Sequence, residues 1–323
     1  MISSNMRSLR TINTARYKSG PRNKKLYFTL VIHRYQHVST RSRQTRSQVN
    51  GPLSTLPTSL DLPTRKADQN VIYHLFSIGK AYLHFYKTGM KNIYYNYKAS
   101  QPIKELIDSK YGGSVKAAAT ANAITRHDFL LVTRNWHDIQ RVPAFGLMFV
   151  IFGEFTPLVV MAISGIVPWT CRVPAQIKND RMKLEQIRQR AFRQLANISS
   201  DKLTSSIGNQ RKLSHISKSL GLSSQLWDWI GGTPTAILQR KVSKKLEHLR
   251  LDDNLIEMAG GVDEMSVEEV QMALVDRGID TIGKNDIQLR HDLNLWLQIR
   301  KNVPMDRLLL ARPSDWPVMA APT

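Results

Sequence analysis

An apolar run of 30 residues constrains this chain more than any other feature of its sequence. It lies between Arg141 and Arg172, reads VPAFGLMFVIFGEFTPLVVMAISGIVPWTC, and contains one charged residue, Glu154. A helix needs about 20 predominantly apolar residues to cross a bilayer, so the run predicts a single transmembrane helix over residues 142–171. A tilt, a kink at Pro157 or ends in the interface would absorb the extra length. The alternative is a buried core helix of a soluble protein, against which the length and the basic flanks argue.

Glu154 is thus the one carboxylate in this run. A carboxylate near the middle of a bilayer costs about 2.5–3.5 kcal/mol, so we expect it to be protonated, paired or turned to a polar cavity. Two interpretations stay open. One is a proton- or cation-handling site. The other is a structural carboxylate that bonds a neighbouring helix in an oligomer or lies near the lipid surface.

The first 60 residues carry 11 basic residues and no acidic one, and they are rich in serine, threonine and asparagine. This composition is typical of an organelle transit peptide. The short apolar stretch 26–32 contains Thr29 and lies far from the start, so it does not resemble the core of a secretory signal. We therefore predict a cleavable mitochondrial presequence over residues 1–60, with a disordered basic tail as the alternative.

The formal net charge of +21 favours an anionic partner such as nucleic acid, a ribosome or anionic lipid. The charge is uneven, because residues 172–250 carry 16 basic and 5 acidic residues whereas residues 251–323 carry 7 basic and 13 acidic ones. The positive density just after the apolar run places the C-terminal half on the side of the membrane where the chain is synthesised. The single cysteine, Cys171, excludes an internal disulfide framework and a cysteine-only zinc site.

Helical periodicity dominates both sides of the run. Upstream, residues 71–97 place apolar side chains at helical spacing with lysines between them, which fits a helix on the membrane surface or a helix packed against the protein. Downstream, an apolar stripe from Ile177 to Leu195 predicts a basic amphipathic helix. A second basic helix is expected over 235–251, and Ser266 with Glu269 forms a capping box before a third helix. No alternating strand pattern competes, so the predicted fold class is all-α.

No catalytic signature occurs: the sequence lacks a GxGxxG, P-loop, HExxH or GxSxG motif. After residue 60 the histidines form no i, i+4 ligand pair, and the stretch 252–254 lacks the spacing of a calcium loop. We therefore predict no enzymatic activity, no cofactor and no metal site. The candidate contacts with ribosomal RNA phosphates or lipid headgroups are basic side chains after the run. They are Arg181, Lys183, Arg188, Arg190, Arg193, Arg211, Lys212, Arg240, Lys241, Lys244 and Lys245.

A pattern of motifs runs through residues 70–300. Around the apolar run it consists of Arg141, Pro143, Gly153-Glu154-Phe155, Pro157 and Pro168. Further on it consists of Ser219-Leu220-Gly221-Leu222, Leu249-Arg250-Leu251-Asp252-Asp253, Ser266-Val267-Glu268-Glu269-Val270, Arg277-Gly278-Ile279 and Trp296-Leu297. In this order the motifs resemble the LETM family, the leucine-zipper/EF-hand transmembrane proteins of the mitochondrial inner membrane, and their ribosome-binding-like domain.

The resemblance implies a single-pass inner-membrane protein whose C-terminal helical domain lies in the matrix. The implied partners are the mitochondrial ribosome and inner-membrane lipid, and DNA is not an expected partner. The family is also linked to potassium/proton or calcium/proton exchange, which would require several subunits to assemble around Glu154. The chain carries no EF-hand and no long coiled coil, so calcium sensing and coiled-coil assembly are not expected. The predicted segments are a transit peptide (1–60), an amphipathic helical segment (61–141), the span (142–171), the ribosome-binding-like domain (172–300) and a tail (301–323).

Overall fold

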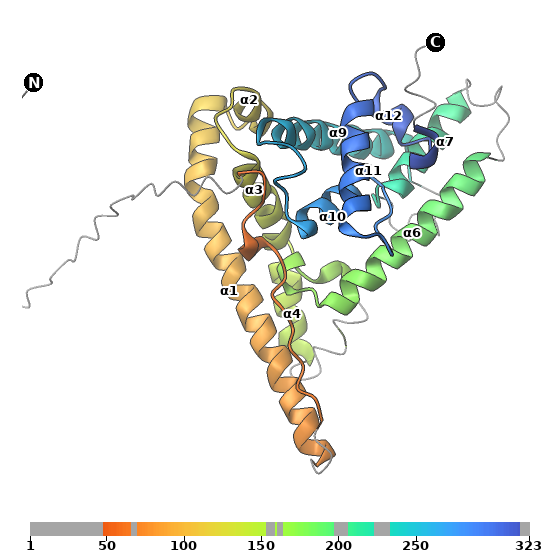
Figure 1. Ribbon diagram of the computed structural model, residues 1–323. Coiled ribbons are helices and arrows are strands. Elements are labelled where there is room, and N and C mark those ends of the chain that lie inside the picture. Colours follow the sequence, from red (N-terminus) through yellow and green to blue (C-terminus); the bar gives the residue numbers. More distant parts are fainter. Residues whose placement is uncertain are drawn as a thin grey trace, which may run out of the picture. The chain divides into compact units, whose positions relative to one another are not determined.

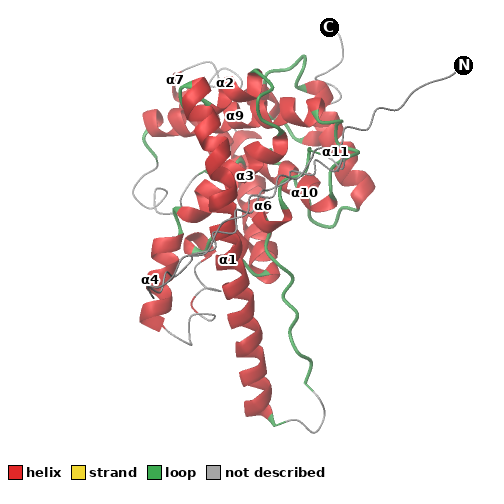
Figure 2. Ribbon diagram, turned by 90° about the vertical axis from the view of Figure 1, so that its left-hand side faces the viewer, coloured by secondary structure: helices red, strands yellow, loops and turns green. Residues whose placement is uncertain are grey.

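The computed structural model describes residues 48–65, 70–152, 159, 164–196, 206–222 and 233–316. Within these ranges the regular structure is helical and no strand occurs, which confirms the predicted all-α class for this part of the chain (Figure 2). Residues 1–47, most of the predicted transit peptide, lie outside the described residues. The helices are α1 (Val71–Tyr111), α2 (Val115–Thr120), α3 (Arg126–Ile139), α4 (Val142–Phe152), α6 (Pro174–Ala196), α7 (Ser206–Ser219), α9 (Thr235–Met258), α10 (Val267–Asp276), α11 (Asp286–Ile299) and α12 (Met305–Leu308).

Helix α1 is longer than the sequence predicts, because it continues from residue 97 to Tyr111. The side chain of Asn70 caps its start by accepting a hydrogen bond from the backbone N–H of Ile72. It ends at Gly112, whose φ of 58° is a left-handed conformation that glycine adopts without strain. From Phe85 onward one face of α1 is buried, mainly against α3, which lies beside it in Figure 1. Of the two arrangements that the sequence left open, this part of the helix adopts packing against the rest of the protein.

The α1 helix also makes a close approach to the short 3₁₀-helix η4 (Trp169–Cys171) at Gly89. A Cβ at this position would lie 2.7 Å from Sγ of Cys171 and 3.0 Å from the carbonyl oxygen of Thr170. Ten residues earlier in the same helix, a Cβ at Gly79 would meet nothing within 4 Å. The contact with η4 therefore requires glycine at position 89, whereas position 79 has room for a larger side chain.

These two glycines make a matched pair of variants. We expect Gly89→Ala to lower the free energy of unfolding by about 1–3 kcal/mol, because the added methyl group overfills the contact. Gly79→Ala should raise it by about 0.5–1 kcal/mol, since alanine loses less backbone entropy in a helix. Urea unfolding followed by helical circular dichroism measures both changes. Equal shifts of the two variants would contradict the close approach.

The C-terminal helices enclose the largest apolar core. It joins α7, α9, α10, α11 and α12, and its centre holds the fully buried Trp296 beside Trp316 at 5.5 Å between ring centroids. Leu308 and Leu309 are buried in the same core. Residues 303–316 of the predicted tail therefore pack into the helical domain. This packing also fixes the backbone that carries the basic side chains of this segment.

The predicted capping box at Ser266 is half formed. The Ser266 side chain accepts from the backbone N–H of Glu269, as a cap should. The carboxylate of Glu269 does not return to the backbone of Ser266. It binds the guanidinium of Arg134 at 2.6 and 2.8 Å, while Asn50 accepts the backbone N–H of Ser266. A tertiary ion pair has displaced the local bond.

The apolar run begins as α4, which contacts α3 and takes up its first 11 residues. Among the described residues, none of the helices combines the length and the apolar sequence needed to cross a membrane. Residues 153–158 and 160–163, which include Glu154 and Pro157, lie outside the described residues. The single span and the role of Glu154 therefore stay predictions.

Candidate functional site

Helix α6 carries its arginines and lysines on two different faces. Arg188 lies on the inner face with the half-buried Leu184 and the buried Ala191, at spacings of four and three residues. Arg188 as a whole is 3 % exposed, and its guanidinium donates to the carbonyl oxygens of Ser219 at 2.7 Å and Val275 at 2.8 Å. Burial lowers the pKa of Arg188. Arg188 therefore fastens α6 to α7 and α10, a role that its spacing from two apolar residues could have revealed.

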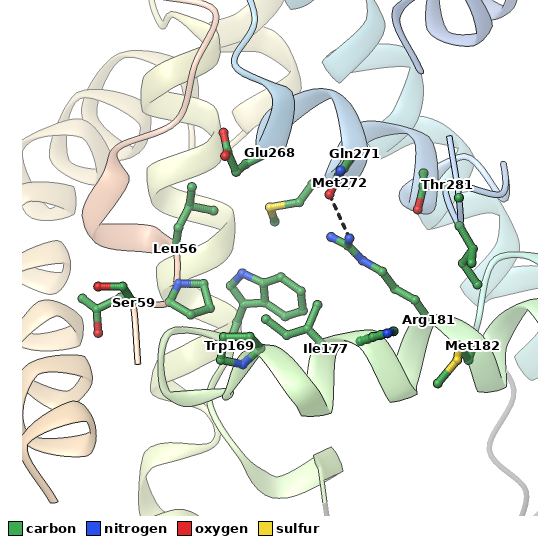
Figure 3. Close-up of a pocket in the computed structure, with 16 residues that line it drawn as sticks. Leu56, Ser59, Trp169, Ile177, Arg181, Met182, Glu268, Gln271, Met272 and Thr281 are labelled. Atoms are coloured by element: carbon green, nitrogen blue, oxygen red, sulfur yellow. Dashed lines mark hydrogen bonds between the residues drawn. The ribbon is translucent and has the colours of Figure 1, made fainter. Parts of the chain in front are cut away.

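Arg181 lies seven residues earlier on the same face. It is half-buried and donates to Oε1 of Gln271 on α10 at 2.9 Å. This bond crosses a cavity of about 500 Å³ between the loop 56–59, η4, α6 and α10 (Figure 3). The side chains around Arg181 are mostly apolar, with Trp169, Ile177 and Met272 among them. Arg181 thus serves mainly to join α6 to α10.

The outer face of α6 presents three exposed cations, Lys183, Arg190 and Arg193. None of them forms an ion pair within the described part of the chain. At about 100° per residue, Lys183 and Arg190 fall nearly in line, and Arg193 lies one turn further at the edge of the same face. These side chains are available to an external anion.

Helices α7 and α9 carry further cations that the sequence predicts as contacts. Arg211 is exposed and Lys212 is half-buried on α7, which contacts both α6 and α9. On α9, three cations within two turns are exposed: Arg240, Lys241 and Lys244. The sequence-predicted candidate Lys245 differs, because its ammonium pairs with Asp276 at 2.7 Å. We define the basic surface as eight of the cations predicted from the sequence, which are exposed or half-buried and form no ion pair in the described residues; Arg181 is left out because it bonds Gln271. The eight are Lys183, Arg190, Arg193, Arg211, Lys212, Arg240, Lys241 and Lys244.

Two grooves lined by cations flank the C-terminal half of α6. The first, about 280 Å³, lies between α6 and α7 and contains Arg211 and Lys218. The second, about 450 Å³, contains Arg193 and Arg312 beside the acidic Glu185 and Asp280, and Arg312 lies 5.5 Å over the ring of Phe192. Sequence reasoning did not name Arg312, because it assigned residues 301–323 to a tail. The buried Leu308, Leu309 and Trp316 around it are the apolar signal that marks this segment as part of the domain.

Two buried aspartates near the C-terminal end of α9 hold this helix in place. Asp252 accepts from Arg126 of α3 and from Arg277, each at 2.8 Å. Burial alone would raise the pKa of Asp252, but the two guanidiniums outweigh it and hold that pKa far below its usual range. Asp253 binds Arg277 and lies 3.2 Å from Arg300. This buried ion network fixes α9 to α3, α10 and α11.

The arrangement of exposed cations suits the binding of anions. No group of three or more histidine, cysteine, aspartate or glutamate side chains in the described ranges could hold a metal ion. The buried carboxylates of Asp252, Asp253 and Glu269 are each engaged by arginines. The cations of the basic surface, by contrast, form no ion pair in the described residues, so electrostatic attraction is the chemistry that this surface offers.

Two family models match this chain. The model described as the pentamidine resistance factor domain matches residues 66–256, more than half of the sequence. The model described as LETM1-like, RBD matches residues 209–314, which include α9 and α10 and most of α7. No solved structure matches the chain. On these matches, the chain belongs to the pentamidine resistance factor family and is a member of the LETM family.

Proposed function

We propose that this protein is held at the mitochondrial inner membrane and binds mitochondrial ribosomes on the matrix side through its basic surface. The observation that carries the proposal is the sorting of charges on α6 and α9. Arg188, Asp252 and Asp253 are buried and bonded inside the protein. The cations on the outer faces are exposed and have no ion pair in the described residues. Membership of an inner-membrane family with a ribosome-binding-like domain supports the same function.

Phosphate groups of ribosomal RNA are the anions that such a surface fits best. Lysine and arginine side chains on helix faces meet a phosphate backbone without reading its sequence. Their contacts release counterions, so affinity falls steeply with salt concentration. The same cations would also meet anionic lipid headgroups at about 1 kcal/mol for each side chain near the surface. The test must therefore separate ribosomes from lipid.

The experiment is co-sedimentation of the full chain with mitochondrial ribosomes, in nanodiscs of neutral lipid. We expect binding at 50 mM salt and a loss of affinity of about 10³-fold at 200 mM, if six or more phosphates are contacted. Vesicles that contain anionic lipid but no ribosomes give the comparison. Binding to the vesicles with none to the ribosomes would refute the ribosome proposal.

We further propose that the protein supports potassium/proton homeostasis. In one alternative the protein itself transports cations, and Glu154 is then the carboxylate that exchanges a proton for a cation. The support is the single charged residue in an apolar run of 30 residues, together with the family. Glu154→Gln in sealed vesicles is the direct test. Unchanged cation exchange by this variant would remove Glu154 from the proposal and leave ribosome binding as the function.

A further inference from the structure

The two ends of the apolar run lie against each other. Before the run, Asp138 is 2 % exposed and accepts from the backbone N–H of Trp169 at 2.6 Å and of Thr170 at 3.3 Å. Arg141, the last residue before the run, donates to the carbonyl oxygen of Gly165 at 3.1 Å. The chain therefore leaves a point near Asp138 and is back beside it by residue 165.

The segments on either side of the run are joined as well. Arg126 of α3 pairs with Asp252 of α9, and their side chains are 1 % and 7 % exposed. Arg134 of α3 pairs with Glu269 of α10, with exposures of 12 % and 1 %. Both pairs connect residues before the apolar run to residues after it. Because both are buried, they are lasting contacts of the folded protein and not transient surface pairs. The contact of Gly89 with Cys171 adds a third connection from α1.

A single crossing of the bilayer is incompatible with these contacts. The hydrocarbon layer is about 30 Å thick, so a crossing would leave Asp138 and Trp169 on opposite faces of the membrane. Hydrogen bonds of 2.6–3.3 Å and buried ion pairs cannot span that distance. The length of the run predicts a crossing, but the positions of its two ends do not allow one while the flanks stay bonded.

We propose that the apolar run enters and leaves the bilayer on the same face, so that residues 70–139 and 174–316 occupy one compartment. The inference rests on the membrane attachment proposed above and changes its topology. The 11 described residues of helix α4, at about 1.5 Å each, span about 16 Å, roughly half of the hydrocarbon layer. Its exposed Leu147, Val150 and Ile151 are the side chains that lipid covers. Segments that enter and leave on one face are tolerated where protein buries their polar backbone.

The matched positions for a topology test are Ser109 on α1 and Ser243 on α9, one on each side of the run. Both are exposed. The natural Cys171 is fully buried, so the unmodified protein provides the background without a reactive thiol at the surface. The double variant Ser109→Cys/Ser243→Cys is reconstituted as the full chain into sealed vesicles and treated with a membrane-impermeant polyethylene-glycol maleimide, which adds a visible mass for each reacted thiol.

This readout does not depend on how the protein is oriented in the vesicles. If the two segments share a compartment, every molecule carries either two tags or none, and detergent converts all molecules to two. If the run crosses once, every molecule carries one tag before detergent, which would overturn the same-face topology while leaving the membrane attachment intact. An alkaline wash precedes the labelling. Release of the protein by this wash would refute the attachment itself and the topology with it.

Discussion

We expect Asp252→Asn to lower the free energy of unfolding by about 3–5 kcal/mol. This is the largest effect that we predict for a single substitution. The reason is that Arg126 and Arg277 are almost fully buried and both direct a guanidinium at this carboxylate. An asparagine keeps the shape but removes the charge, so two buried cations lose a neutralising partner. Thermal or urea unfolding of the full chain in detergent, followed by circular dichroism, measures the change.

Glu247→Gln on the same helix is the control. Glu247 pairs with Lys116 at 3.0 Å, but the two side chains are 50 % and 65 % exposed. An exposed ion pair is worth about 0–1 kcal/mol, so this variant should unfold almost as the unmodified protein does. Similar destabilisation by the two substitutions would show that the burial of Asp252 does not matter.

The same network predicts a pH dependence. Because the arginines hold the pKa of Asp252 below its unfolded value, its ionised form favours the folded state. This stabilisation is fully present above the ordinary aspartate pKa of about 3.9 and declines as the pH falls toward the lower pKa of the folded state. The Asp252→Asn variant should therefore lose less stability between neutral and acidic pH than the unmodified protein.

The second large effect concerns ribosome binding. We expect the triple variant Arg240→Gln/Lys241→Gln/Lys244→Gln to bind ribosomes at least about 10²-fold more weakly at low salt, because it removes three phosphate contacts at once. The dependence of log affinity on log salt concentration should become shallower by about 3, close to one unit for each lost contact. Co-sedimentation over a salt series measures both quantities.

A charge-matched variant shows whether position or total charge is responsible. Lys87, Lys91 and Lys110 are exposed on α1, away from the basic surface. Replacing these three lysines by glutamine changes the net charge equally and should alter ribosome binding by less than about 3-fold if the contacts lie on α9. An equal fall in the two triple variants would indicate attraction by net charge alone. The circular dichroism of both variants should match that of the unmodified protein, since all six side chains are exposed.

The helices were predictable where local rules decide them. Helix α9 begins at residue 235 as predicted, Ser266 caps α10, and the apolar stripe of α6 packs as its spacing indicates. These features depend on residues within one or two turns of each other. The main boundary differences, at the ends of α1 and α9, arise because tertiary contacts extend both helices. Ile107 is buried against α2 and α3, and Leu255 and Ile256 are buried in the cores around α9.

The ion network could not be predicted in the same way. The stretch 252–254 can be recognised as lacking a calcium-loop spacing, but the arginine that binds Asp252 from α3 lies 126 residues earlier. No periodicity connects such distant positions, and Glu269 has local cap geometry that gives no sign of Arg134. The two faces of α6 were within reach of the sequence, since Arg181 and Arg188 share the spacing of Ile177, Leu184 and Ala191. Exposed cations could be separated from buried ones there by helical geometry alone.

The distance in sequence between Arg126 and its partners also sets an order of assembly. Asp252 follows Arg126 by 126 residues and Glu269 follows it by 143. A chain that is delivered from its N-terminus therefore presents Arg126 and then the apolar run long before either carboxylate arrives. Until then Arg126 must remain hydrated, because no anion is present to compensate it in a dry site. We therefore expect the apolar run to meet lipid first. Helices α9 and α10 would pack against α3 only afterwards, as a late step of biogenesis.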